Sequence, residues 1–513
     1  MRLLALLPLA LLAVAVSIAG DPPKKVAPKF PFSKDTTYFE GPLGDEGYVD
    51  YESAINGVLR GKLKPEENAV VGLLQCLGPK PEGSPLRPEF YKWLGAKAPP
   101  EKGDYLIDSI KYFKIPYSGE ERKQLEELEI RLRQRPWVAK DAPKHVEWLK
   151  VNEKPLGAAA DAVKRSGWFH PVIARKSDGT RGDFISELMP MIQKCRGIAF
   201  TLAIRVNYHL GAGRFDDALA DVMTMHRLAR QVSHSASGIG YLVAVAVDAI
   251  AQNSGLVLLE HGKRTAKQAR RYQAELLALP PFAPFVDKVN LYERVMVLDV
   301  IQGMHRDGAN DFSHGGLEDL TPEQRAAALD WPLMMKIGNE YLDRLVAALR
   351  KPSRAERWKA VGEIGAESEK KLWRMRDLTR LQKFFLMADP DKKRLKVSER
   401  VGLLIPAALA ISADRIGDVA DRAEQITRNT LLATALAAHF AEHKAYPAKL
   451  AALAPKSIAK VPDDVFSGKP LIYKRTAKGY LLYSVGVNGK DDGGHLLTDD
   501  PRGDDIGVRM PRN

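Results

Sequence analysis

The chain has 513 residues, of which 45% are hydrophobic and 27% are charged, and it holds two cysteines. This composition excludes a disordered chain and a disulfide-stapled miniprotein, and the length allows two or three domains with full cores. The net charge is +13, but the basic residues are spread along the chain rather than gathered in one run. Nucleic-acid binding is therefore not expected.

Residues 1–19 predict a signal peptide. Arg2 supplies the positive start, residues 3–16 form an apolar stretch, and residues 17–19 form a small-residue cleavage site. The alternative is an uncleaved anchor, since Lys24 and Lys25 follow the apolar stretch. A cleaved signal predicts a periplasmic, secreted or cell-surface protein.

The mature chain is not predicted to span a membrane. Its most apolar segment, residues 238–260, is interrupted by Asp248, Gln252 and Asn253, and residues 401–412 are too few to cross a bilayer.

The two cysteines, Cys76 and Cys195, leave two possibilities open. An exported protein can join them in a disulfide. Each of them, however, lies in a stripe of apolar residues spaced three and four apart, as on the buried face of a helix. Buried free thiols are therefore the favoured interpretation.

The first part of the chain is expected to hold an extended leader, residues 20–47, and an N-terminal helical region, residues 48–182. The leader is rich in Pro, Lys and Gly and has no apolar periodicity. Short helices are predicted after it, separated by Pro/Gly-rich stretches at residues 78–103 and 175–183.

A central helical-hairpin region is predicted over residues 183–400. Apolar residues from Cys195 to Leu210 form one helical stripe, Gly211-Ala212-Gly213 interrupts it, and a second stripe runs from Phe215 to Val232. A third helix is expected from about Gly240. The turn at residues 213–218 resembles that of a tetratricopeptide repeat, but it does not recur 34 residues away, which indicates one hairpin rather than an array.

The remaining helical patterns lead into a different C-terminal sequence, so residues 401–513 are expected to form a long helix plus a small β module. Beyond Tyr446-Pro447, short aromatic runs at residues 471–473 and 479–484 are typical of strands. Helices are predicted before that point at residues 287–305, 322–350, 354–386 and 397–443.

The histidines of the central hairpin are candidates for chemistry. His209, His226 and His234 lie near Asp217 and Asp221 in the sequence, so a His/Asp proton-transfer pair is conceivable. A core or boundary histidine is favoured for His226. The sequence contains no nucleophile elbow, P-loop or dinucleotide fingerprint.

The segment from His439 to His443 matches the H-x-x-E-H pattern of inverted zinc proteases, with Glu442 beside the second histidine. A catalytic zinc needs a third protein ligand. The short chain beyond offers only carboxylates from a turn-rich tail, so we expect the two histidines to cap a helix end.

The acidic C-terminal loop is the strongest candidate site. Six aspartates stand against one lysine and one arginine between residues 488 and 505, and like charges held close repel unless a cation lies between them. Ca²⁺ takes carboxylate and carbonyl oxygens on flexible, glycine-rich loops. An EF-hand fits poorly, and a solvated acidic turn is the alternative. The candidate metal ligands are Asn488, Asp491, Asp492, Asp499, Asp500, Asp504 and Asp505.

Separate pieces of this region follow one another in an order that resembles the C-terminal half of the major pseudopilin of type II secretion systems. They are Tyr446-Pro447, residues 462–473, residues 479–489 and Asp504-Asp505-Ile506. The resemblance implies a helix, a small β-sheet and a terminal calcium-binding loop. Val465 and Asn488 depart from the family's usual proline and aspartate, and the chain lacks a prepilin leader, so assembly into a pilus is not expected.

The upstream body resembles large exported bacterial proteins of unknown function, a resemblance that brings no activity. The sequence thus predicts a mainly α-helical fold of helical hairpins with a small C-terminal antiparallel β module, pseudopilin-like in its α+β arrangement. The expected function is an exported, non-enzymatic structural or interaction protein with a calcium-stabilised module and a protein partner in the cell envelope. The alternatives are an envelope hydrolase with a site among the hairpins, or a binder of anionic glycan or lipid surfaces.

Overall fold

The computed structural model describes residues 27–29, 31–174, 184, 191–262, 265–307, 329–373 and 390–512. The predicted signal peptide at residues 1–19 and the Pro/Gly-rich stretch at residues 175–183 lie outside the described residues. So does the beginning of the helix predicted over residues 322–350.

Short helices build the N-terminal region, as predicted. Two buried asparagines hold it together: the Asn56 amide exchanges two hydrogen bonds with the backbone of Val172, and Asn68 does the same with Phe169. Because buried backbone groups need partners, these side chains fix the return of the chain at residues 168–174. The elements are α1 (Tyr51–Arg60), a 3-10 turn (Pro65–Glu67), α2 (Ala69–Leu77), α3 (Pro88–Leu94), α4 (Ser109–Phe113), α5 (Glu120–Gln134), α6 (Pro143–Val151) and α7 (Glu153–Ala162).

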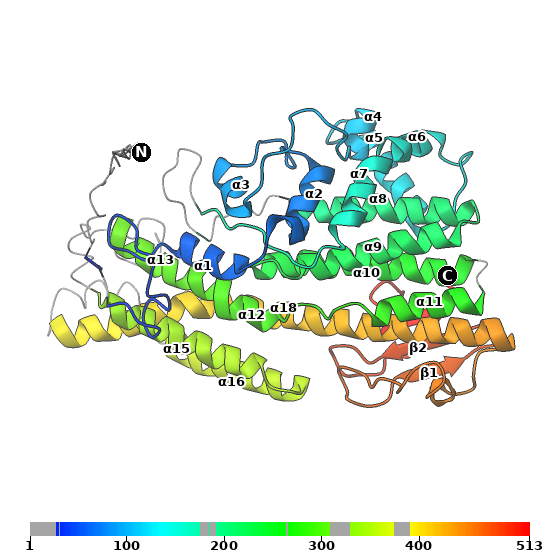
Figure 1. Ribbon diagram of the computed structural model, residues 1–513. Coiled ribbons are helices and arrows are strands. Elements are labelled where there is room, and N and C mark those ends of the chain that lie inside the picture. The colour runs from blue at the N-terminus through cyan, green and yellow to red at the C-terminus, as the bar shows by residue number, and fades with distance from the viewer. Residues whose placement is uncertain are drawn as a thin grey trace, which may run out of the picture.

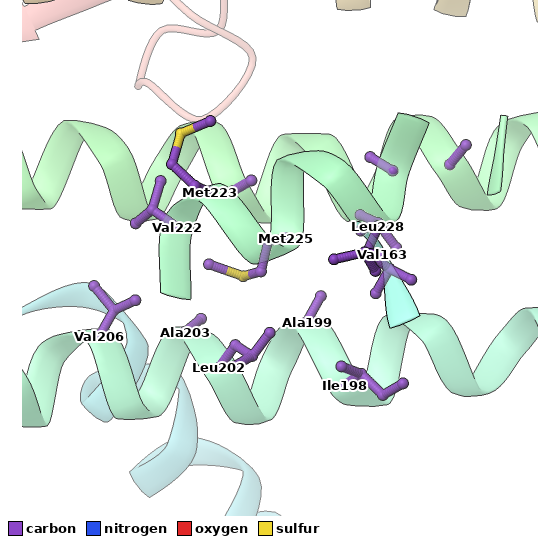
Figure 2. Packing of buried hydrophobic residues seen from close by; sticks show 14 of the residues in the cluster. Val163, Ile198, Ala199, Leu202, Ala203, Val206, Val222, Met223, Met225 and Leu228 are labelled. Atoms are coloured by element: carbon purple, nitrogen blue, oxygen red, sulfur yellow. The ribbon is translucent and has the colours of Figure 1, made fainter. Parts of the chain in front are cut away.

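The predicted central hairpin is confirmed. Helices α8 (Ile192–Gly211) and α9 (Phe215–Val232) are antiparallel, and α10 (Gly238–His261) and α11 (Ala266–Leu277) continue the stack (Figure 1). Figure 2 shows apolar side chains of α8, such as Leu202, facing those of α9, such as Met225. Spacings of three and four residues put these side chains on one face of each helix.

The second half of the body is built on a long helix. Helix α18 (Pro390–His443) has 54 residues, a length of roughly 80 Å at 1.5 Å per residue. It is continuous through residue 400, where the sequence suggested a boundary. The preceding elements are α12 (Phe285–Lys288), a π-helical turn (Val289–Glu293), α13 (Arg294–Asp307), α15 (Trp331–Leu349) and α16 (Arg354–Trp373).

Buried side chains form two large hydrophobic clusters, and α18 contributes to both. The first includes α2, α7 to α11, the C-terminal half of α18 and the sheet, and the second includes α1, α13 and α15. Both cysteines are buried free thiols in the first cluster, as the favoured interpretation predicted.

The described part of the leader is packed against the body. Tyr51 donates a hydrogen bond to the carbonyl of Thr37, Asn339 of α15 donates to the carbonyls of Asp35 and Thr36, and the guanidinium of Arg294 lies 4.6 Å from the centre of the Tyr38 ring. These contacts fix residues 35–38 on α13 and α15.

The sheet is small, antiparallel and C-terminal, so the fold is mainly α with a small β module, as predicted. Its strands β1 (Ile472–Arg475), β2 (Tyr480–Ser484) and β3 (Ile506–Met510) lie in the order β1-β2-β3. Figure 1 shows the sheet along the C-terminal half of α18, on the side away from α11.

Helix α10 is the one described helix that is long and apolar enough to cross a membrane by length and composition. Most of that segment, 61%, is buried inside the protein, as in a core helix. The described residues therefore contain no clear transmembrane span.

Candidate functional site

The β module is held on α18 by side chains that bond to its backbone. Asn429 donates to the carbonyl of Ile506 over 2.8 Å, and Gln425 accepts from the N–H of Val465 over 2.8 Å. Inside the module, the buried carboxylate of Asp464 accepts hydrogen bonds from the hydroxyl of Ser484 and the N–H of Val485. This places the end of β2, and hence the start of the acidic loop, at a fixed position.

The acidic loop connects β2 to β3 over residues 486–505. It begins at Gly486, whose φ is +66°, and a Cβ there would lie 2.1 Å from the carbonyl oxygen of Asp504. Only glycine fits such a left-handed, closely approached position. The two ends of the loop are thereby brought together.

Four of the candidate ligands form one hydrogen-bonded group at this closure. Asp504 Oδ2 accepts from the N–H of Asn488, and Asp492 Oδ2 accepts from the N–H of Asp504 and from the amide of Asn488. Asp491 Oδ1 accepts from the Tyr483 hydroxyl and from the N–H of Gly493. These bonds, the one from Gly493 most, lower the pKa of Asp491.

Asp505 differs from the other carboxylates of the loop. It is 2% exposed; its Oδ2 accepts from the N–H of Gly494 over 2.7 Å, while its Oδ1 has no hydrogen-bond partner among the described residues. Burial raises the pKa of Asp505, the Gly494 bond opposes the rise, and the charges of Asp492 and Asp491 add to it. A buried carboxylate oxygen facing like charges is destabilising unless a cation or a proton compensates it.

The two remaining aspartates have other surroundings. Asp499 accepts from the N–H of Leu496 and pairs with Arg509 of β3 over 3.0 Å, whereas Asp500 is exposed. The structure therefore joins Asn488, Asp491, Asp492, Asp504 and Asp505 and leaves Asp499 and Asp500 outside that group.

The sequence argument that the loop has too few basic residues counted the segment alone, and it missed cations that the fold supplies. Arg422 of α18 forms an ion pair with Asp504, and Arg509 pairs with Asp499. Lys474 of β1 lies close enough for its charge to interact with Asp491 and Asp505. Arg422 lies 82 residues from Asp504 in the chain, so no local sequence signal could have paired them.

The loop offers only oxygen ligands, which suits Ca²⁺. In the described part of the chain, no three side chains among His, Cys, Asp and Glu are grouped so that they could hold a metal ion together. The oxygens of Asp491, Asp492 and Asp504 are instead directed to N–H groups, Tyr483 and Arg422. The unpartnered Oδ1 of Asp505 is the oxygen that fits a cation without giving up another contact.

A second polar cluster lies inside the central hairpin, and it involves a partner that sequence proximity did not indicate. His226 of α9 bonds through Nδ1 to Asp248 of α10 over 2.8 Å and through Nε2 to the hydroxyl of Tyr272 of α11 over 3.3 Å. Arg230 and Gln252 also bond to Asp248. All five side chains are buried, so His226 is a core histidine, as favoured above.

The other histidines of the hairpin have separate surroundings. His209 Nε2 lies 3.5 Å from Asp221, whose carboxylate is held by Arg205 over 2.6 Å, and burial lowers the pKa of His209. His234 is exposed, and burial of part of its ring together with the charge of Lys288 lowers its pKa.

The H-x-x-E-H segment forms the last turn of α18. The rings of His439 and His443 are stacked with their centres 4.1 Å apart, and their Nδ1 atoms bond to the carbonyls of Ala445 and His439. Glu442 pairs with Arg270 over 2.6 Å. The two histidines thus bond to carbonyls at the helix end, as expected of capping residues.

Comparison of this chain with protein-family models, with curated proteins and with solved structures gives no match.

Proposed function

We propose that this chain is an exported, non-enzymatic structural or interaction protein of the periplasm or cell surface, with a C-terminal module stabilised by Ca²⁺. The signal-like residues 1–19 support export. A protein partner in the cell envelope is part of the proposal, because a long helical body that carries a separate small module is suited to binding rather than to enclosing a substrate.

The observation that carries the calcium proposal is Asp505. Its Oδ1 is buried and unpartnered, and the nearby carboxylates of Asp491 and Asp492 raise its pKa further. A divalent cation at this point would satisfy the orphaned oxygen and remove the repulsion. Asp491, Asp492 and Asp504 are the side chains that would complete its oxygen ligands, together with loop carbonyls.

The order of elements also supports a pseudopilin-like module. A long helix is followed by a three-stranded antiparallel sheet, and the acidic loop precedes the last strand. This is the arrangement that the resemblance implied. In this chain, however, the helix is the last part of a large body rather than a leader for assembly.

The polar side chains of the central hairpin support a structural role for that region. Both ring nitrogens of His226 are hydrogen-bonded within the core, and Asp248 is shared by Arg230, His226 and Gln252. Groups committed in this way stabilise helix packing.

Thermal unfolding and calorimetric titration of the full chain test the proposal. We expect a higher unfolding midpoint in Ca²⁺ than in chelator, with about one ion bound per chain, and a smaller effect of Mg²⁺, which prefers a tighter octahedral site. Identical unfolding curves in Ca²⁺ and chelator, with no binding heat, would mean that the acidic loop is a solvated turn.

A further inference from the structure

Arg422 brings a charged group of the helical body into the acidic loop. It lies on α18 and forms an ion pair with Asp504 Oδ1, while the other oxygen of Asp504 accepts the N–H of Asn488. Both side chains are largely buried, with 24% and 21% of their surfaces exposed. A partly desolvated ion pair of this kind is stronger than one on the surface.

The neighbouring acids of α18 have their own partners. Asp418 pairs with Arg354 of α16, and Asp421 pairs with Arg354 and Arg357. The printed partner of Arg422 is Asp504 alone. The guanidinium therefore compensates the charge of the loop rather than that of its own helix.

We infer that Arg422 is a built-in competitor for the calcium site, so that the loop either pairs with α18 through Asp504 or gives that carboxylate to Ca²⁺. This inference rests on the calcium site proposed above. A carboxylate oxygen directed at a guanidinium is not available as a full ligand to a divalent ion, and Asp504 lies at the closure of the loop beside Asp492. Ca²⁺ binding must break the ion pair or do without Asp504.

The competition gives calcium a way to regulate how the loop sits on the body. Two links that do not involve the loop carboxylates, Asn429 to Ile506 and Gln425 to Val465, keep the sheet on α18. Loss of the Arg422 pair would therefore release the loop without detaching the module. By linkage, whatever strengthens the ion pair weakens calcium binding by the same factor.

The calcium dissociation constant of the full-length Arg422→Gln variant tests the competition. Titration should show binding at least about tenfold tighter than in the unaltered protein, which corresponds to about 1.4 kcal/mol. The matched control is Arg428→Gln, since Arg428 also links α18 to the module, through the carbonyl of Asp463, but does not touch the loop carboxylates. Its affinity should stay within about twofold of that of the unaltered protein.

A second measurement does not depend on the folding of a variant. Arginine-specific labelling with phenylglyoxal, read out by peptide mass spectrometry, should modify Arg422 faster in Ca²⁺ than in chelator, with Arg428 unchanged. Equal calcium affinity in the Arg422→Gln and unaltered proteins, or slower labelling of Arg422 in Ca²⁺, would overturn the competition and leave the site standing. No calcium binding in either protein would overturn the site and the competition together.

Discussion

The imidazole of His226 and the carboxylate of Asp248 are joined across the α9–α10 hairpin by a 2.8 Å hydrogen bond between Nδ1 and Oδ1. Arg230 approaches the same oxygen over 2.7 Å, and its guanidinium lies 4.1 Å from the centre of the Phe282 ring. One buried carboxylate thus ties together two helices and the segment that follows α11. The polar residues that interrupt the apolar sequence of α10 are the ones that fix its packing.

Replacing Asp248 by asparagine should strongly destabilise the protein, because Arg230 would keep a buried charge without its partner. The expected loss is about 3–5 kcal/mol in the free energy of unfolding, measured by chemical denaturation. Asp217→Asn is the control, since Asp217 is on the surface of the same hairpin, 58% exposed, and should change stability by less than about 0.5 kcal/mol. A similarly small effect of Asp248→Asn would mean that the cluster is not a structural link.

The same variant predicts a pH dependence. Burial alone would raise the pKa of Asp248, but Arg230 and His226 outweigh it and hold the pKa well below its usual value. The stability that this carboxylate contributes is therefore present above its unfolded pKa of about 3.9 and is lost as the pH falls below that value. The difference between the unaltered protein and Asp248→Asn should shrink in acid.

Much of the fold could be predicted from periodicity, because helices with one apolar stripe repeat every three to four residues. The α8–α9 hairpin and strands β1 and β2 were found in this way. Strand β3 was not, because Ile506 to Met510 includes glycine and arginine and gains its partners only by pairing with β2. The continuity of α18 also escaped, since Pro390 was taken for a break but is tolerated as the first residue of a helix.

The candidate site was predictable only in part. The loop and its aspartates could be chosen from composition, but Arg422 and Lys474 come from α18 and β1, so only the fold brings them to it. The distinction of Asp505 depends on burial, which a run of six similar aspartates does not reveal. Asp248 escaped as the partner of His226 because sequence proximity pointed to Asp217 and Asp221 instead.

Cys76 and Cys195 should both label under denaturing, non-reducing conditions and resist labelling in the folded protein. Burial raises the pKa of each thiol to about 12, and the thiolate is the reactive form. Intact mass after alkylation decides the point: two labels are expected after denaturation. A mass without labels would mean that the two cysteines are joined in a disulfide.

His439 and His443 should be dispensable for metal content. Their Nδ1 atoms are committed to backbone carbonyls, and Glu442 is paired with Arg270. The purified protein and the His439→Ala/His443→Ala double variant should therefore contain the same substoichiometric zinc by elemental analysis. One zinc per chain that disappears in the double variant would contradict this prediction.

Lys288 should destabilise the protein at neutral pH. Burial lowers its pKa to about 8, and Asp287 offsets this only in part. Because the unfolded chain holds this proton up to about pH 10.4, stability should rise between pH 8 and pH 10.4. Lys288→Met should add on the order of 3 kcal/mol at pH 7 and much less at pH 10. Lys336→Met, at a lysine that is 52% exposed, is the control, and an equal gain in both variants would exclude burial as the cause.

Asp505 should control the calcium response of the whole module. Burial raises its pKa, with Asp492 and Asp491 adding to the rise, so in chelator the folded protein should lose stability as the pH increases through the raised value. Ca²⁺ reverses this effect, because an ion that binds only the folded state adds about 2.7 kcal/mol at a hundredfold excess over its dissociation constant. Asp505→Asn removes the buried charge and its ligand oxygen together, so the variant should be at least as stable in chelator and should no longer respond to Ca²⁺. Asp500→Asn, at an exposed aspartate outside the ligand group, should keep the full response. Denaturation of the three proteins in Ca²⁺ and in chelator measures both effects, and a response of Asp505→Asn equal to that of the unaltered chain would place the ion elsewhere.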